Sequence, residues 1–154
     1  MSKLLDVEMS NEVAKSIASK ANSPFANAYK AVLATAGATY VQGFLVFIGQ
    51  PYKPIEHGWI ELGDRIIDPS LPHLHKNPQG MSYFPAQILT RKKLQAIITE
   101  SEEDYPEDDP LPIYGEGPYE YYGDLMLGGK EYLVAHQAAV KKCREINRPN
   151  IDNN

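Results

Sequence analysis

Apolar residues near the start of the chain recur with the spacing of an α-helix. Val13, Ile17 and Ala21 lie four residues apart, so they fall on one helix face. Ser10 precedes them and is a residue type that caps helix N-termini. The pattern predicts an amphipathic helix from about residue 10 to 21.

A second helix is predicted directly after a break at Asn22. Ser23 suits the capping position and Pro24 the first helical position, where a missing N–H costs nothing. Gly37 ends the pattern, so this helix is expected to reach about Ala36. Its apolar positions are Phe25, Ala28, Tyr29, Val32 and Leu33.

The next segment changes to a β pattern. Residues 40–48 are rich in β-branched and aromatic side chains and are apolar on both faces, which is typical of a covered central strand. A hairpin is predicted after it, with arms at 57–62 and 65–68 and a Gly63-Asp64 turn.

The second half of the chain is less regular. Residues 69–85 contain five helix-breaking Pro and Gly residues and are expected to be irregular, and Thr90 is predicted to cap a helix. Residues 100–113 form an acidic, proline-rich segment, interpreted as an exposed loop. A last helix is predicted from Lys130 to Asn147, followed by a polar tail, 148–154. We therefore expect one domain over residues 1–147.

Charge excludes one large class of function. The chain carries 15 basic and 20 acidic residues, a net charge of −5, and seven of the acids lie between Glu100 and Asp109. Nucleic-acid binders present basic patches to phosphates, and no such patch is found, so no nucleic-acid partner is predicted. The tyrosines between Tyr114 and Tyr122 are instead typical of protein interfaces and indicate a surface for oligomer formation.

The cellular setting is predicted from what the sequence contains. Cys143 is the sole cysteine, so an intramolecular disulfide is excluded. The first residues do not form a signal peptide, and no apolar stretch has the length of a membrane span. We expect a cytoplasmic protein without a membrane partner.

The hairpin carries the residues with the clearest chemical potential. His57 lies on one arm and Asp68 ends the other, and residues that flank a tight turn symmetrically become neighbours. A carboxylate that accepts a hydrogen bond from one imidazole nitrogen leaves the other nitrogen free as a base. The two residues are therefore predicted to hydrogen-bond each other directly, as the orienting half of a catalytic triad.

Five short motifs in order resemble a known superfamily. They are Phe25-Ala26-Asn27-Ala28, Tyr40-Val41-Gln42-Gly43-Phe44, Glu56-His57-Gly58-Trp59, Ile67-Asp68-Pro69 and Tyr83-Phe84. The chain thereby resembles small bacterial and phage-borne proteins of the papain-like superfamily, relatives of the transglutaminase-like and NlpC/P60-like hydrolases. The resemblance covers residues 22–98, about half of the chain. It implies an α+β, papain-like fold, with N-terminal helices packed on a small antiparallel sheet.

The resemblance also assigns roles, with one departure. His57 and Asp68 inherit the base and its orienting carboxylate, and Asn27, Gln42 and Trp59 are candidate binding residues. The family's nucleophilic cysteine aligns with Pro24, which has no nucleophile. Ser23 lies one residue earlier and is the doubtful substitute.

Three functions follow as hypotheses. The favoured one is a catalytically inactive papain-like domain that serves as a binding or regulatory module for a protein or peptide. The first alternative is an amide, ester or thioester hydrolase that uses His57 and Asp68 with Ser23 or water as nucleophile. The second is a structural or assembly protein. No cofactor is predicted, and no metal site, because His73 and His75 lack further ligands at suitable spacing.

Overall fold

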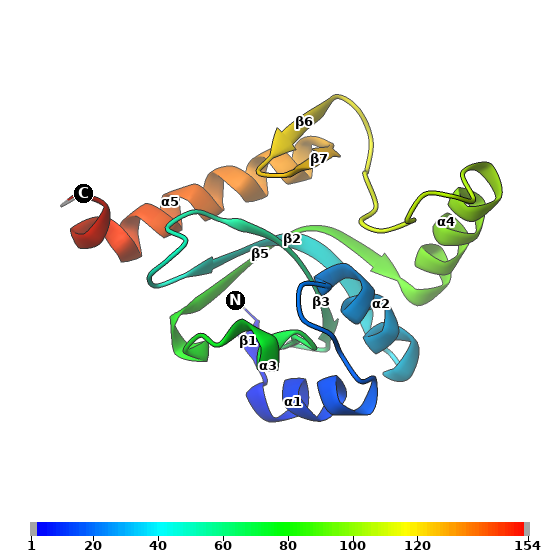
Figure 1. Cartoon of the computed structure of the whole chain (residues 1–154), viewed down its shortest axis with the longest axis horizontal. Helices are drawn as coiled ribbons and strands as arrows, with labels where there is room; N and C mark the ends of the chain where they lie inside the picture. Colours follow the sequence, from blue (N-terminus) through cyan, green and yellow to red (C-terminus); the bar gives the residue numbers. More distant parts are fainter. Residues whose placement is uncertain (1–2, 153–154) are drawn as a thin grey trace. The chain divides into compact units, whose positions relative to one another are not determined.

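The computed structural model describes residues 3–152, which form a mixed α+β fold (Figure 1). The chain divides into two compact units. Unit 1 comprises Met1–Gln42, Gly58–His75 and Ile88–Ile113. Unit 2 comprises Gly43–His57, Lys76–Gln87 and Tyr114–Asn154. The predicted α+β class is confirmed.

The main sheet contains five strands in the order β1-β4-β3-β2-β5. Their bounds are Leu4–Leu5 for β1, Thr39–Phe47 for β2, Ile55–Leu62 for β3, Arg65–Ile67 for β4 and Met81–Thr90 for β5. The predicted hairpin is confirmed, since β3 and β4 are antiparallel with Leu62 opposite Arg65. Strand β1 pairs parallel to β4, so the sheet is mixed and larger than the small antiparallel sheet expected.

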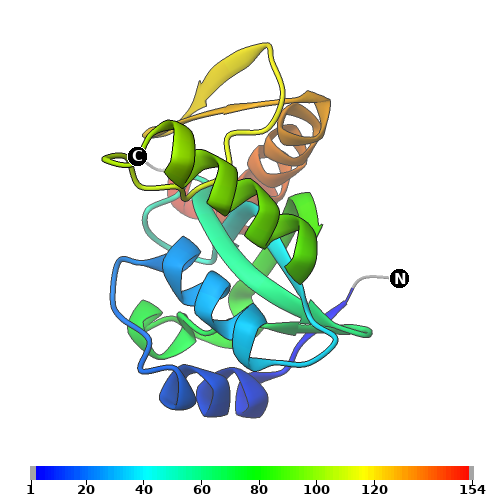
Figure 2. The same ribbon diagram turned by 90° about the vertical axis from the view of Figure 1, so that its right-hand side faces the viewer.

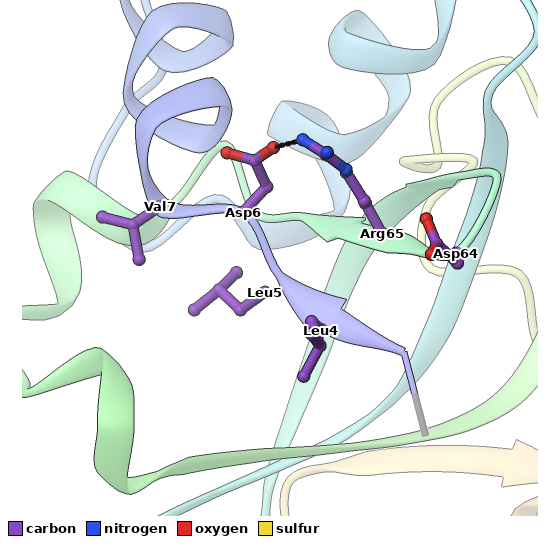
Figure 3. A pocket seen from close by; sticks show the side chains of 6 residues that line it. All are labelled: Leu4, Leu5, Asp6, Val7, Asp64 and Arg65. Carbon is purple, nitrogen blue, oxygen red and sulfur yellow. Dashed lines mark hydrogen bonds and ion pairs between the residues drawn. The ribbon is translucent and has the colours of Figure 1, made fainter. Parts of the chain in front are cut away.

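Helix α1 of unit 1 spans Val7–Ser16, so the prediction of a helix over 10–21 was wrong at both ends. Asp6, not Ser10, is the N-cap, and its side chain accepts a hydrogen bond of 2.9 Å from the Met9 N–H. Asp6 also forms an ion pair with Arg65 of β4, beside a pocket lined by the β1 leucines (Figure 3). These contacts fix the start of α1 one turn earlier than the sequence pattern indicates.

Helices α2 and α4 of unit 1 begin where the sequence predicts. Helix α2 spans Pro24–Ala34 with Ser23 at the N-cap, and α4 spans Arg91–Asp104 with Thr90 at the N-cap. The Thr90 hydroxyl accepts from the Lys93 N–H at 3.2 Å. Because α4 runs to Asp104, the first five residues of the predicted 100–113 loop are helical.

The core of unit 1 is apolar and lies between these helices and their strands. Short helix α3, Leu71–Leu74, packs against α1. The sheet contributes Tyr40, Ile60 and Ile67, all fully buried, and α4 adds Leu94. Burial of each large side chain contributes about 1.5–3 kcal/mol to folding, so this cluster anchors the hairpin.

Unit 2 contains a second hairpin and the longest helix. Strands β6, Tyr119–Tyr122, and β7, Leu125–Gly128, pair antiparallel and pack on α5, Lys130–Asp152 (Figure 2). The helix therefore continues through 148–152, where a polar tail was expected. Residues 78–80 form a short 3₁₀ helix, η1 (Pro78–Gly80), ahead of β5.

The core of unit 2 is more aromatic than that of unit 1. The ring of Phe44 meets those of Tyr122 and Tyr132 edge-on, at centroid distances of 5.7 and 6.4 Å. Asn147 of α5 is fully buried and satisfies two backbone groups where β2 ends, the Phe47 carbonyl at 2.8 Å and the Gly49 N–H at 2.7 Å. In the described residues, no helix is both long and apolar enough to cross a membrane.

Candidate functional site

The carboxylate of Asp68 lies in a buried polar network within unit 1. Asp68 follows β4 and is fully buried, and its Oδ1 accepts a hydrogen bond of 2.9 Å from the Ser70 N–H. The backbone N–H of Asp68 donates to the Ser10 hydroxyl at 2.9 Å, and that hydroxyl donates to the Asp6 carbonyl at 2.6 Å. Helix α1 thus holds the backbone at Asp68, while the Ser70 amide orients its side chain.

Asn27 links this network to helix α2. Its side-chain nitrogen donates to the Ser70 hydroxyl at 3.0 Å and to the Lys20 carbonyl at 2.8 Å. Its Oδ1 accepts from the Lys20 N–H at 3.0 Å. Both amide protons are therefore used, which makes Asn27 a clamp between the loop before α2 and the segment after β4.

The first turn of α2 lies against strand β3. A Cβ added at Gly58 would come within 3.3 Å of the Pro24 carbonyl oxygen and within 3.0 Å of the Phe25 ring. These contacts are tighter than most Cβ contacts in proteins, so a larger residue at Gly58 would require its neighbours to shift by a few tenths of an ångström. Strand β3 and the start of α2 therefore meet at the residue that follows His57 in the sequence.

Ser23 is placed at this same turn but is bonded elsewhere. It is half-buried, makes no side-chain capping bond, and its hydroxyl donates to the Ala21 carbonyl at 3.3 Å. Cys143, the other conceivable nucleophile, is buried in α5 of unit 2.

Gln42, also in unit 1, holds the segment after the acidic loop. Its side chain is fully buried and pairs with the backbone of Ile113, donating to the carbonyl at 2.8 Å and accepting from the N–H at 2.7 Å. The Tyr40 hydroxyl donates to the same Gln42 oxygen at 2.6 Å. The sequence predicts Gln42 as a binding residue, and these contacts show that it also attaches the backbone at Ile113 to β2.

Trp59, the third candidate binding residue, is fully buried in β3. Its indole N–H approaches Glu61 Oε2 at 3.5 Å, a long hydrogen bond, and Glu61 Oε1 accepts from the Lys3 ammonium at 2.8 Å. Glu61 is therefore a buried carboxylate with a cationic partner, which is the condition under which burial of a charge is tolerated.

His57 lies in unit 2 and is buried, with its ring centroid 6.3 Å from that of Tyr83. The neighbouring Glu56 accepts a hydrogen bond of 3.2 Å from the Asp124 N–H in the β6–β7 turn. Burial raises the pKa of Glu56 above its usual range, although hydrogen bonds from the backbone N–H groups of Glu56 and Asp124 act in the opposite direction. The predicted hydrogen bond between His57 and Asp68 stays a prediction.

Ser19 and His73 contact each other, but with the wrong proton arrangement for catalysis. His73 Nε2 lies 3.1 Å from the Ser19 hydroxyl and 2.9 Å from the Ser19 carbonyl oxygen. A carbonyl oxygen only accepts, so Nε2 carries the proton and donates it. That nitrogen is then not available to remove a proton from the hydroxyl.

The part of the chain that the structure describes contains no group of three or more His, Cys, Asp or Glu side chains able to hold a metal ion. Neither protein families, nor curated proteins, nor solved structures provide a match to this chain.

Proposed function

We propose that this chain is a papain-like domain that has lost its nucleophile and serves as a binding or regulatory module for a protein or peptide. The observation that carries the proposal is the close approach of the α2 first turn to β3 at Gly58, with Pro24 in that turn. A papain-type nucleophile lies at the start of a helix, beside the strand that bears the catalytic histidine.

The chemistry of Pro24 explains why no acyl transfer is expected. A cysteine at a helix N-terminus beside an imidazolium becomes a thiolate, because both groups stabilise negative charge, and its pKa falls to roughly 3 to 4. Proline at this position keeps the helix start but supplies no sulfur. The Ser23 hydroxyl donates to the Ala21 carbonyl, a contact that supplies no base to activate it.

The hairpin register supports the second half of the proposal, a pairing of His57 with Asp68. Ile60 lies opposite Ile67, so continuing the same register would set Asp68 opposite Trp59, two residues from His57. Side chains two residues apart on a strand share a face, and diagonal neighbours lie within reach of each other. The proposed pair would then be a remnant of the base and its orienting carboxylate.

The test is to restore the nucleophile. Pro24→Cys is treated with iodoacetamide across a range of pH, and labelling is located by mass spectrometry, so that Cys143 is followed separately. We expect rapid labelling at position 24, with a thiol pKa well below the unperturbed value of about 8.5. The double variant Pro24→Cys/His57→Ala should lose that low pKa. Ala26→Cys, exposed in the same first turn, is the matched control and should react as an ordinary thiol.

Two assays on the parent separate the proposal from the hydrolase alternative. Peptide, amide and thioester substrates should not be turned over, with or without prior alkylation. Turnover lost on alkylation would contradict the proposal, since it would require Cys143 to act. Covalent labelling by a fluorophosphonate that disappears in Ser23→Ala would establish the serine hydrolase instead.

A second candidate function, assembly of several copies, rests on the outer face of the β6–β7 hairpin. Tyr119, Tyr121 and Met126 share that face, because Tyr121 lies opposite Met126, and they are 49%, 74% and 42% exposed. Tyrosine and methionine are enriched at protein interfaces. Sedimentation velocity of the parent beside Tyr121→Ser tests this: a concentration-dependent oligomer that Tyr121→Ser dissociates supports assembly, whereas a monomer at all concentrations excludes it.

A further inference from the structure

Unit 2 contains a pocket of about 490 Å³ that none of the sequence motifs indicates. The loop between β2 and β3 contributes Tyr52, Lys53 and Pro54 to its lining, and helix α5 contributes four further residues. Gly123, in the β6–β7 turn, also lines it. The volume falls within the range of about 300–1,000 Å³ that small-molecule sites occupy.

Helix α5 presents one continuous face to this pocket. His136, Val140, Cys143 and Arg144 all line it, at spacings of four, seven and eight residues that fall on one side of an α-helix. The face is apolar in the middle, with Val140 and the buried Cys143, and polar at both ends. A ligand in this pocket would therefore meet an apolar floor between two polar groups.

The loop between β2 and β3 is held in place by specific contacts. Tyr52 has a φ of 59°, in the left-handed region that residues with a side chain rarely adopt, and its N–H donates to the Gly49 carbonyl at 3.2 Å. Asn147 fixes the same loop through its bond to the Gly49 N–H. Strained backbone of this kind persists where surrounding contacts enforce it, and it is concentrated at ligand sites.

Two cationic side chains line the pocket, Lys53 and Arg144, and they differ in their carboxylate neighbours. Lys53 and Arg144 are both exposed, and neither forms an ion pair with the side chains that the structure describes. Glu56 lies over Gly123, accepts from the Asp124 N–H, and interacts electrostatically with Lys53 and with the Asp124 carboxylate. Arg144 is thus the cation left to bind an anion from outside.

His136 adds a neutral polar group at the other end of the helix face. Its ring packs on Phe44 and Tyr122, with centroids 5.1 and 5.0 Å apart. Burial lowers the pKa of His136, so the imidazole is neutral at pH 7 and can donate or accept one hydrogen bond.

We propose that this pocket binds a carboxylate attached to an apolar body, with Arg144 on the carboxylate and Val140, Tyr52 and Pro54 around the body. A planar guanidinium can bind a carboxylate through two parallel hydrogen bonds, whereas a lysine ammonium is a compact point charge without this geometry. The same chemistry occurs in a free carboxylic acid and in the C-terminal residue of a peptide, and the probes below distinguish these two sources.

The test measures binding of 3-phenylpropionate to the full chain by calorimetry and by NMR of the histidine ring protons. We expect saturable binding that raises the pKa of His136, because a bound anion stabilises the imidazolium. The neutral 3-phenylpropionamide should bind at least about tenfold more weakly, the change expected when one charge-assisted hydrogen bond is lost. The peptide Ala-Ala-Phe, compared with its C-terminal amide, shows whether a peptide end is accepted as well as the free acid.

Two variants locate the site. Arg144→Gln should weaken binding of 3-phenylpropionate about tenfold, and Lys141→Gln, an exposed neighbour on α5 outside the pocket, should leave it unchanged. Equal loss in both variants would show that only general charge attracts the acid. Equal binding of acid and amide, or no binding of 3-phenylpropionate, would equally overturn the proposal. None of these outcomes depends on Pro24 or on the proposed papain-like role.

Discussion

The side-chain amide of Asn27 donates a hydrogen bond of 3.0 Å to the hydroxyl of Ser70, a residue 43 positions later in the chain. Through Ser70 it is connected to the carboxylate of Asp68, so a residue of α2 and the end of the first hairpin share one buried polar network. A network of this kind stabilises only while every member has a partner.

Asn27→Ala is therefore expected to destabilise the protein by about 1–3 kcal/mol, because it leaves the buried Ser70 hydroxyl without its donor and frees the Lys20 backbone. Urea unfolding followed by circular dichroism measures the change. Asn11→Ala, exposed in the middle of α1, is the matched control and should shift the free energy of unfolding by less than about 0.5 kcal/mol. Equal effects in the two variants would show that the network contributes nothing.

Gly43 permits the closest backbone approach within unit 2. A Cβ at this position would lie within van der Waals overlap of the Phe84 carbonyl oxygen and 3.0 Å from the Pro85 Cα. Neither backbone atom can move without displacing β5, so Gly43→Ala should cost about 3 kcal/mol or more, or prevent folding. Gly80→Ala, which meets only the movable and exposed Ile48 side chain, should cost less than about 1 kcal/mol. Thermal unfolding of the two variants decides the matter, and a stable Gly43→Ala protein would refute this packing.

The pH dependence of stability should contain a contribution from Asp6. Its pKa is lowered by the hydrogen bond from the Met9 N–H and by Arg65, so the ionised form stabilises the fold. That contribution is fully present above the unfolded pKa of about 3.9 and is lost as the pH falls through the lower, folded value. Asp6→Asn, which still caps the helix, should be less stable than the parent at pH 7, and the difference should vanish in acid.

Urea unfolding at a series of pH values provides the comparison for Asp6. Asp64→Asn removes a carboxylate next to the same arginine in sequence, but one without an ion pair among the described side chains. It should therefore not reproduce the loss at pH 7. An Asp6→Asn protein as stable as the parent at pH 7 would contradict the role of this charge.

The C-terminal end of α4 carries charge of the unfavourable sign. Glu102, Glu103 and Asp104 occupy its last turn, which has no basic residue, and negative charge there opposes the helix dipole. Glu103→Lys should thus raise the free energy of unfolding by about 0.3–1 kcal/mol at low salt, and by less at high salt. Glu107→Lys makes the same charge change beyond the helix end, where no gain from the dipole is expected. A gain of equal size at both positions would point to general charge repulsion instead.

The elements that the sequence predicts well are those with strong local signals. The first hairpin follows from the Gly63-Asp64 turn, and α2 and α4 from their capping residues. The second hairpin has the same signal, a Gly123-Asp124 turn with Gly123 at a φ of 75°, and could have been found in the same way. Strand β5 was missed because it contains Pro85, which is tolerated only because β5 lies at the edge of the sheet.

The candidate site is less accessible to sequence reasoning, because its partners are distant along the chain. The motif resemblance identifies Asn27 as a candidate binding residue. Its hydrogen bonds to Lys20 and Ser70 depend on the contact between the loop before α2 and the segment after β4, which the sequence does not reveal. The residues of α5 that line the pocket, from His136 to Arg144, have a helical spacing in the sequence. Only the tertiary structure shows that Tyr52 and Lys53 line the same pocket. Long-range contacts of this kind have no local pattern to reveal them.

The bonds from Asn147 to the end of β2 also set the order of events during synthesis. Phe47 leaves the ribosome 100 residues before the side chain that satisfies its carbonyl. Until then the exposed end of β2, with its apolar neighbours, is open to mispairing with other nascent chains. Unit 2 therefore reaches its final form only after α5 has emerged, and its newly made chains should depend on chaperones more than a domain folded from local contacts would.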